Sequence, residues 1–224
     1  MREIVLDTET TGLDPFSGHR LIEIGAIELD NRIITSKKFH VYINPQTTIS
    51  EGAYRVHGIS NAMLADKPLF KDIAHSFLEF IEGATLIIHN ARFDLKFLNY
   101  ELSLLNLPSI DSESVIDTLT IARNLYPRTK VNLDALCKKF KVDNSDRAFH
   151  GALKDAKLLA EVYSHLTGGK QFSFSFESEN NAHIQIETQE SLSDKIVNNK
   201  IISPTEDELL SHANFMSNFS KKVN

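Results

Sequence analysis

Five side chains in the sequence are of the types that bind metal ions or move protons, and they lie in three separate stretches. Asp7 and Glu9 lie two residues apart where the apolar run EIVLDT ends. Asp94 follows the apolar run ATLII, and His150 and Asp155 lie five residues apart in HGALKDA. Four carboxylates are oxygen ligands of the kind that Mg²⁺ and Mn²⁺ prefer. A histidine beside them can exchange a proton near neutral pH.

This combination predicts hydrolytic phosphoryl transfer. Two divalent ions about 3.5–4 Å apart can activate a water and hold the leaving oxygen of a phosphodiester. Taken singly, each feature has a structural alternative: Asp7 and Glu9 as solvated acids at a strand end, Asp94 as an acid favoured by a helix dipole, and His150 as a polar cap. The co-occurrence of all of them favours the metal site.

The hydrophobic pattern predicts the elements that must position these side chains. A strand has a period of two, so Asp7 and Glu9 share one side of the first strand. The predicted strands are residues 3–8, 20–30, 37–43, 84–88 and the short SVID, which ends at Asp117. The predicted helices are residues 70–82, 92–105, 133–140 and 152–167. Three strands followed by alternating helices and strands indicate an α/β domain with a mixed sheet and flanking helices. Asp117 is expected to be a structural acid at a strand end.

Composition sets broad limits on the class of protein. The 224 residues, 42% of them hydrophobic, suit one domain with an extension. No apolar run approaches the roughly 18 residues of a membrane helix, and no signal peptide precedes the first strand. A single cysteine, Cys137, excludes an internal disulfide and fits a cytoplasmic location. The net charge is −6, so bulk charge does not predict nucleic-acid binding.

The motifs DTETTG, HNARFD and HGALKDA resemble, in order and spacing, the three exonuclease motifs of the DEDDh family. EIGAIEL, FHVYINP, YRVHGIS and TGGK extend the resemblance over residues 3–169, toward the members that proofread for bacterial replicative polymerases. The resemblance implies a ribonuclease H-like fold. It also implies a 3′→5′ exonuclease that removes mispaired nucleotides from DNA 3′ ends and releases nucleoside 5′-monophosphates.

The resemblance assigns a role to each of the five side chains. Asp7 would bridge two ions, Mg²⁺ or Mn²⁺. Glu9 and Asp155 would hold the ion that binds the attacking water, and Asp94 would help to hold the second ion, partly through water. His150 would be the general base. Through the ions, Asp7, Glu9 and Asp155 would also contact the substrate.

Two further residues would contact the terminal nucleotide. His57, in VHGI, resembles the family residue that does so. Gly52 would let the backbone approach that nucleotide. The expected substrate is the single-stranded 3′ end of DNA.

After the exonuclease domain, residues 1–169, the composition shifts to Ser, Asn, Gln and Glu. Residues 170–176 resemble a clamp-binding peptide, with Gln171, Phe174 and Phe176 as contacts to the sliding clamp (beta). Their Phe-Ser alternation also fits a short edge strand packed on the domain. Residues 177–202 read as a flexible linker in the C-terminal tail. Residues 203–224 regain apolar side chains and would dock on the polymerase catalytic (alpha) subunit. A small theta-like subunit is a further partner that the resemblance admits.

Two other functions remain open at this point. The chain could be a stand-alone DEDDh exonuclease that trims RNA or oligonucleotide 3′ ends with the same chemistry. It could also be a non-catalytic scaffold that binds polymerase. The filled catalytic positions argue against the scaffold, and an assay of DNA against RNA separates the two nucleases.

Overall fold

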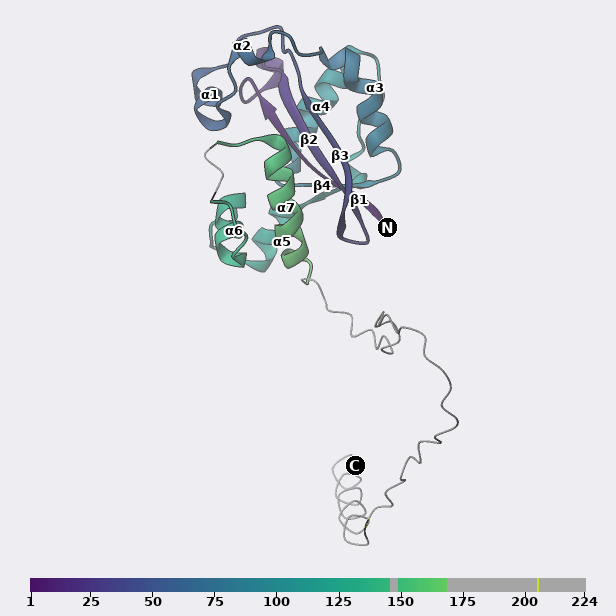
Figure 1. Ribbon diagram of the computed structural model, residues 1–224, viewed down its shortest axis with the longest axis vertical. Coiled ribbons are helices and arrows are strands. Elements are labelled where there is room, and N and C mark those ends of the chain that lie inside the picture. The colour runs from purple at the N-terminus through teal and green to yellow at the C-terminus, as the bar shows by residue number, and fades with distance from the viewer. Residues whose placement is uncertain (146–148, 169–204, 206–224) are drawn as a thin grey trace, which may run out of the picture. The chain divides into compact units, whose positions relative to one another are not determined.

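Figure 1 shows the computed structural model, which describes residues 1–145, 149–168 and 205. The chain divides into two compact units, Met1–Ser175 and Phe176–Asn224. Five strands of the first unit form one sheet in the order β3-β2-β1-β4-β5. β2 runs antiparallel to both β1 and β3, whereas β4 and β5 run parallel to β1, so the sheet is mixed, as predicted. The strands are β1 (Arg2–Thr10), β2 (Leu21–Asp30), β3 (Ile33–Tyr42), β4 (Thr85–Ile88) and β5 (Val115–Asp117).

The helices cover both faces of this sheet (Figure 1). Every helix and strand predicted within residues 1–169 is present, with bounds that differ by a few residues, whereas the helical segment predicted at residues 203–220 lies outside the described residues apart from Thr205. Three short helices, α1, α2 and α5, were not predicted. Of the helices in the described part of the chain, none has the length and apolar character to cross a membrane. The helices are α1 (Glu51–His57), α2 (Asn61–Leu64), α3 (Phe70–Ile81), α4 (Ala91–Leu104), α5 (Thr118–Leu125), α6 (Leu133–Phe140) and α7 (Ala152–Leu166), with 3₁₀ turns η1 (Pro15–Ser17) and η2 (Ser112–Ser114).

β1 is buried on both faces, and its side chains point alternately into two layers of the core. Ile4 and Leu6 belong to the cluster that includes side chains of α3 and α4. Val5, between them, belongs to the cluster with α7. Because successive side chains alternate, Asp7 and Glu9 continue the side of Val5 and face α7. Thr8 continues the opposite side and faces α4.

The first turn of α7 is fixed directly on β2. A Cβ atom on Gly25 would overlap the backbone of Ala152 and Leu153, so only glycine allows this approach. Glu23, which is buried, accepts a hydrogen bond from the backbone N of Ala152 at 3.1 Å. Its other oxygen lies 2.8 Å from Nε2 of His40 on β3. β2 therefore sets both the distance and the direction of the helix that carries Asp155.

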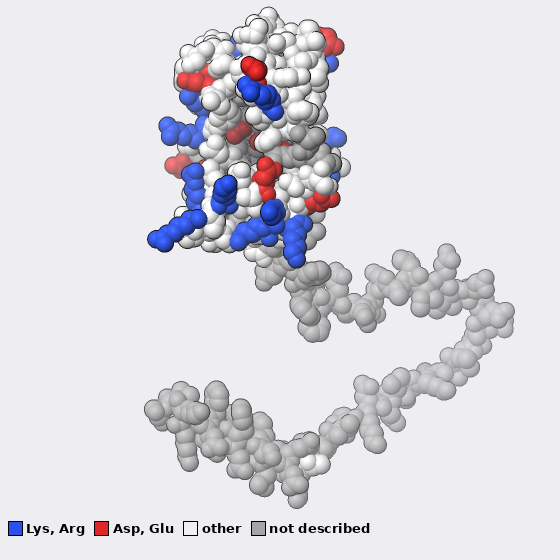
Figure 2. Space-filling model, turned by 90° about the vertical axis from the view of Figure 1, so that its left-hand side faces the viewer, with Lys and Arg blue, Asp and Glu red and all other residues white. Residues whose placement is uncertain are grey.

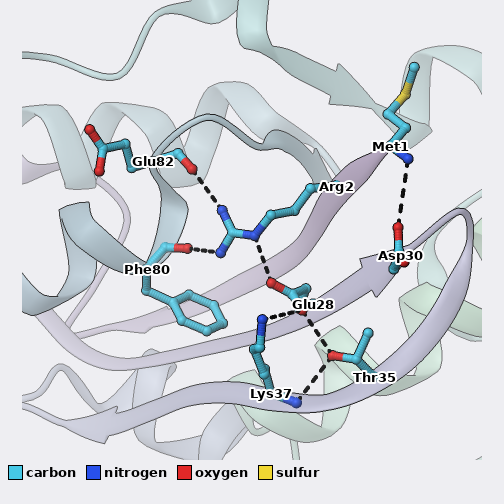
Figure 3. Close-up of polar contacts among 8 residues, drawn as sticks. All are labelled: Met1, Arg2, Glu28, Asp30, Thr35, Lys37, Phe80 and Glu82. Carbon is cyan, nitrogen blue, oxygen red and sulfur yellow. Dashed lines mark hydrogen bonds and ion pairs between the residues drawn. The ribbon is translucent and has the colours of Figure 1, made fainter.

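At the opposite end of the sheet, a polar network ties β1 to α3 (Figure 3). Arg2 Nε donates to Glu28 at 2.6 Å, and the same guanidinium donates to the backbone carbonyls of Phe80 and Glu82 at 2.6 and 2.7 Å. The hydrogen bond from Arg2 and the nearby Lys37 lower the pKa of Glu28. The network anchors the start of β1, at the end of the strand opposite Asp7 and Glu9.

The predicted clamp peptide (170–176), linker (177–202) and docking tail (203–224) lie outside the described residues, apart from Thr205.

Candidate active site

All five side chains predicted to do the chemistry line one cleft of about 620 Å³, called here the carboxylate cleft. Asp7 and Glu9 come from the end of β1, and Asp94 and Asp155 come from the first turns of α4 and α7. Single ligand atoms of Glu9, His150 and Asp155 lie within 4.8 Å of one another. Elements far apart in the sequence thus bring four carboxylates and one histidine together.

Asp94 is almost fully buried at the carboxylate cleft. It is 3% exposed, and the hydroxyl of Thr8 donates a hydrogen bond to it at 2.6 Å. Burial raises the pKa of Asp94 to about 7, although the Thr8 hydrogen bond acts in the opposite direction. A buried carboxylate whose charge is opposed by its surroundings is stabilised by a nearby cation. Together with three further carboxylates, this donor set fits a hard divalent ion.

His150 lies at the mouth of the cleft. Its side chain is 43% exposed, and its Nδ1 lies 3.3 Å from Oδ2 of Asp155. Its backbone N donates to the carbonyl of Val56 in α1 at 3.1 Å, which fixes the segment before α7. The histidine is therefore positioned between Asp155 and solvent, where it can exchange protons.

A second cleft of about 640 Å³ shares Glu9 and Phe93 with the carboxylate cleft. His57 and Gly52 of α1 line it, so the structure places both predicted nucleotide contacts beside the carboxylates and outside their cluster. His57 is buried, its Nδ1 accepts from the backbone N of Ile59 at 3.0 Å, and its buried Nε2 makes no hydrogen bond within the described residues. Burial lowers the pKa of His57, which favours the neutral ring. A Cβ on Gly52 would meet open space.

Asp117 has the structural role predicted for it. One of its oxygens accepts from the backbone N of Leu119 at 2.9 Å and so caps α5. The same oxygen accepts from the backbone N of Asn90 at 3.0 Å. Asn90 precedes α4, so Asp117 supports the helix that carries Asp94 without joining the carboxylate cluster.

Sequence reasoning did not identify several residues that support the site. Thr8, Glu23 and Gly25 hold Asp94 and the first turn of α7 in place. An isolated glycine inside an apolar strand is itself a signal for close backbone approach, so Gly25 was identifiable from the sequence. Two cations, Arg123 and Lys130, also line the carboxylate cleft. No motif marks them.

The class of the protein follows from a comparison with known families. Residues 4–163 match the family model described as Exonuclease. The fold is similar to that of exonuclease X in complex with 5′ overhanging duplex DNA, with 28% identity, a TM-score of 0.58, and coverage of 74% of this chain and 90% of that one. It is also similar to the nuclease domain of 3′hExo, a DEDDh family member, with 21% identity, a TM-score of 0.64, and coverage of 74% and 91%. The family model and the solved structures agree that the fold is that of an exonuclease.

Relatives place the chain more closely within this class. It is 54% identical to the DNA polymerase III subunit epsilon of Rickettsia felis, over 99% of this chain and 98% of the relative. It is 45% identical to the same subunit of Haemophilus influenzae, over 99% and 91%, and 41% identical to that of Salmonella typhimurium, over 99% and 94%. The chain therefore belongs to the exonuclease family, in its branch of DNA polymerase III epsilon subunits.

Proposed function

We propose that the carboxylate cleft removes mispaired nucleotides from DNA 3′ ends by hydrolysis. As a member of the epsilon branch, the chain is a proofreading 3′→5′ exonuclease. The observation that carries the assignment to this cleft is the convergence of carboxylates from β1, α4 and α7 with His150. Four acids in one cleft would repel each other and a nucleic acid, unless cations are bound there.

DEDDh exonucleases use divalent metals, and we assign two ions, Mg²⁺ or Mn²⁺, to Asp7, Glu9, Asp94 and Asp155. When bound, such ions lower the pKa of a water and stabilise charge on the phosphate oxygens. Asp7 would contribute to both ions, Glu9 and Asp155 to one of them, and Asp94 to the other.

His150 is the proposed general base. Its Nδ1 lies 3.3 Å from Asp155, which is suited to stabilise the ring when it takes the proton of the attacking water. The exposed side of the ring then lets the proton pass to solvent. Attack on the last phosphodiester breaks its bond to the O3′ of the preceding nucleotide and releases a nucleoside 5′-monophosphate.

The second cleft would hold the terminal nucleotide next to the ions. His57 is suited to this because its ring is neutral and lines this cleft. Gly52 adds no side chain to the wall of the cleft. A mismatched end frays more readily, so discrimination requires only that the cleft accept unpaired nucleotides.

The epsilon identity implies association with DNA polymerase III and with DNA. We further assign Gln171, Phe174 and Phe176 to the sliding clamp and residues 203–224 to the catalytic (alpha) subunit, with the cytoplasm as the location. A theta-like subunit is a possible further partner. Titration of clamp against the wild type and a Gln171→Ala, Phe176→Ala double variant tests the peptide. Equal affinity would rule it out, and a large loss of domain stability would favour the edge-strand alternative.

The function itself is tested with a primer that carries a labelled 3′ nucleotide. Release should be faster from a mismatched than from a matched DNA end, and faster from single-stranded DNA than from RNA of the same sequence. Preference for RNA would favour the stand-alone trimming enzyme. No release with Mg²⁺ or Mn²⁺ would favour a non-catalytic scaffold.

A further inference from the structure

A basic surface adjoins the carboxylate cleft although the chain as a whole is acidic. Residues 118–145, which include α5 and α6, contain six basic and two acidic residues, a net charge of +4 in a chain of net charge −6. All six basic side chains are exposed. They are Arg123, Arg128, Lys130, Lys138, Lys139 and Lys141, and they are called here the basic lobe. Figure 2 shows Lys and Arg side chains gathered on the lower part of this face of the domain.

Helix dipoles account for some of these charges but not for the whole lobe. Arg123 lies in the last turn of α5, and Lys138 and Lys139 lie in the last turn of α6, where cations are favoured. Arg128 and Lys130 lie between the helices and gain nothing from either dipole. Among the described residues, none of the six makes an ion pair with an acid. The charge of the lobe is thus available to a ligand.

Two members of the lobe connect it to the chemistry. Arg123 and Lys130 line the carboxylate cleft together with Asp7, Asp94 and Asp155. The second cleft shares Glu9 with the carboxylate cleft, but neither of the two cations lines it. A strand with its terminal nucleotide in the second cleft and its last phosphodiester at the carboxylates can continue across the rest of the carboxylate cleft. The lining of that cleft includes Arg123 and Lys130.

We propose that the basic lobe binds the phosphates of the DNA strand upstream of the cleaved bond, with Arg123 and Lys130 as the first contacts. The inference rests on the proposed function and adds a binding surface to it. Phosphates of the upstream strand are repelled by the four carboxylates of the cleft. The cations Arg123 and Lys130 offset that repulsion. These contacts carry no sequence information, which suits an enzyme that must accept any 3′ end.

The test compares a long and a minimal substrate. A 20-nucleotide single strand carries upstream phosphates, whereas the dinucleotide TpT carries only the phosphodiester that is cleaved. The variant is Arg123→Gln, Lys130→Gln in the full chain, and the matched control is Lys38→Gln, Lys71→Gln, which removes the same charge from exposed positions on β3 and α3. Both are assayed with Mn²⁺ over a range of salt concentrations, after their melting temperatures have been compared with that of the wild type.

The expected result is an increase of about tenfold in the KM of the variant for the 20-mer, well beyond any change in kcat. Its loss of kcat/KM should be several times larger on the 20-mer than on TpT. The slope of log KM against log salt should fall by about 1.4, since each lost contact to a single strand removes about 0.7. The control should behave as the wild type.

Equal losses on the 20-mer and on TpT, or an unchanged salt slope, would overturn the inference while the proposed function stands. Lost binding to the polymerase catalytic subunit with unchanged KM for DNA would also overturn it, because the lobe would then be a protein-docking surface. A wild type that cleaves neither substrate would overturn the proposed function and the inference together.

Discussion

Gly25 of β2 stands directly opposite Asp7 of β1 in the antiparallel ladder. The first turn of α7 occupies the space that a side chain at Gly25 would fill. Gly25 therefore brings α7 close to Asp7, because it has no side chain to keep the helix away. Asp155, in that first turn, owes its place to this contact.

A Gly25→Ala substitution should impair both stability and activity. The new methyl group would overlap backbone atoms, which cannot move aside as a flexible side chain can, so α7 must shift. We expect a loss of roughly 1–3 kcal/mol in the free energy of unfolding, together with a large loss of nuclease activity, measured by urea titration and by nucleotide release. Gly52→Ala is the control for stability. Its new methyl group meets open space in a helix, so the free energy of unfolding should rise by about 0.4–1 kcal/mol. Equal stabilities of the two variants would contradict this account of α7.

A His150→Ala substitution should slow hydrolysis roughly 10²–10⁴-fold while the domain stays folded. The side chain is exposed, so its removal leaves no cavity. The measurement is kcat with Mn²⁺ near pH 7, alongside the melting temperature. His75→Ala, on the exposed face of α3, serves as the matched control and should retain full activity. Full activity of the His150 variant would show that another group takes the proton.

The pair of Tyr163 and Glu3 predicts a pH-dependent difference in stability. Tyr163 of α7 donates a hydrogen bond to Glu3 of β1 at 2.8 Å, and both residues are buried. Burial, with help from Glu3, raises the pKa of Tyr163 to about 12. The folded state thus favours the protonated phenol, so its stabilising contribution is complete below about pH 10 and is lost as the pH rises through about 12.

Tyr163→Phe should accordingly lower the free energy of unfolding at pH 8 by about 1–3 kcal/mol, because Glu3 loses its partner. The gap between wild type and variant should shrink at pH 11, where the wild type has begun to lose the contribution. Urea titrations of both proteins at the two pH values measure this. A gap that stays constant would mean that Tyr163 titrates outside this range.

Much of the fold was readable from the sequence because its strongest elements have long, regular patterns. β1 and β4 are short apolar runs, and α3, α4 and α7 each carry an apolar stripe over three turns or more. Of the three unpredicted helices, α1 and α2 have seven and four residues, which is too short for a period of 3.6 to stand out. The third, α5, has eight residues, as many as α6, which was predicted, so length alone does not explain why α5 was missed. Asn31 and Arg32, which separate β2 from β3, both adopt the positive φ of a tight hairpin turn.

The grouping of the five candidate residues in one cleft was predictable, whereas most of the residues that support them were not. Acids placed after apolar strands stand out, because such positions are unfavourable without a cation. Thr8 and Glu23 act through partners more than 80 residues away in the chain, Asp94 and Ala152. No local pattern reports such a contact. Arg123 and Lys130 likewise become site residues only when α5 and the segment after it fold against the cleft.

The most direct test of the central claim is the order of release from an oligonucleotide labelled at its 3′ end or at its 5′ end. The wild type and Asp155→Asn are compared with Mn²⁺ and with a chelator, and metal affinity is measured by calorimetry. We expect the wild type to release the 3′ label first, as a nucleoside 5′-monophosphate, and only when metal is present. Asp155→Asn should bind metal more weakly and release almost nothing. Release of the 5′ label first, activity in the chelator, or full activity and metal affinity in Asp155→Asn would contradict it.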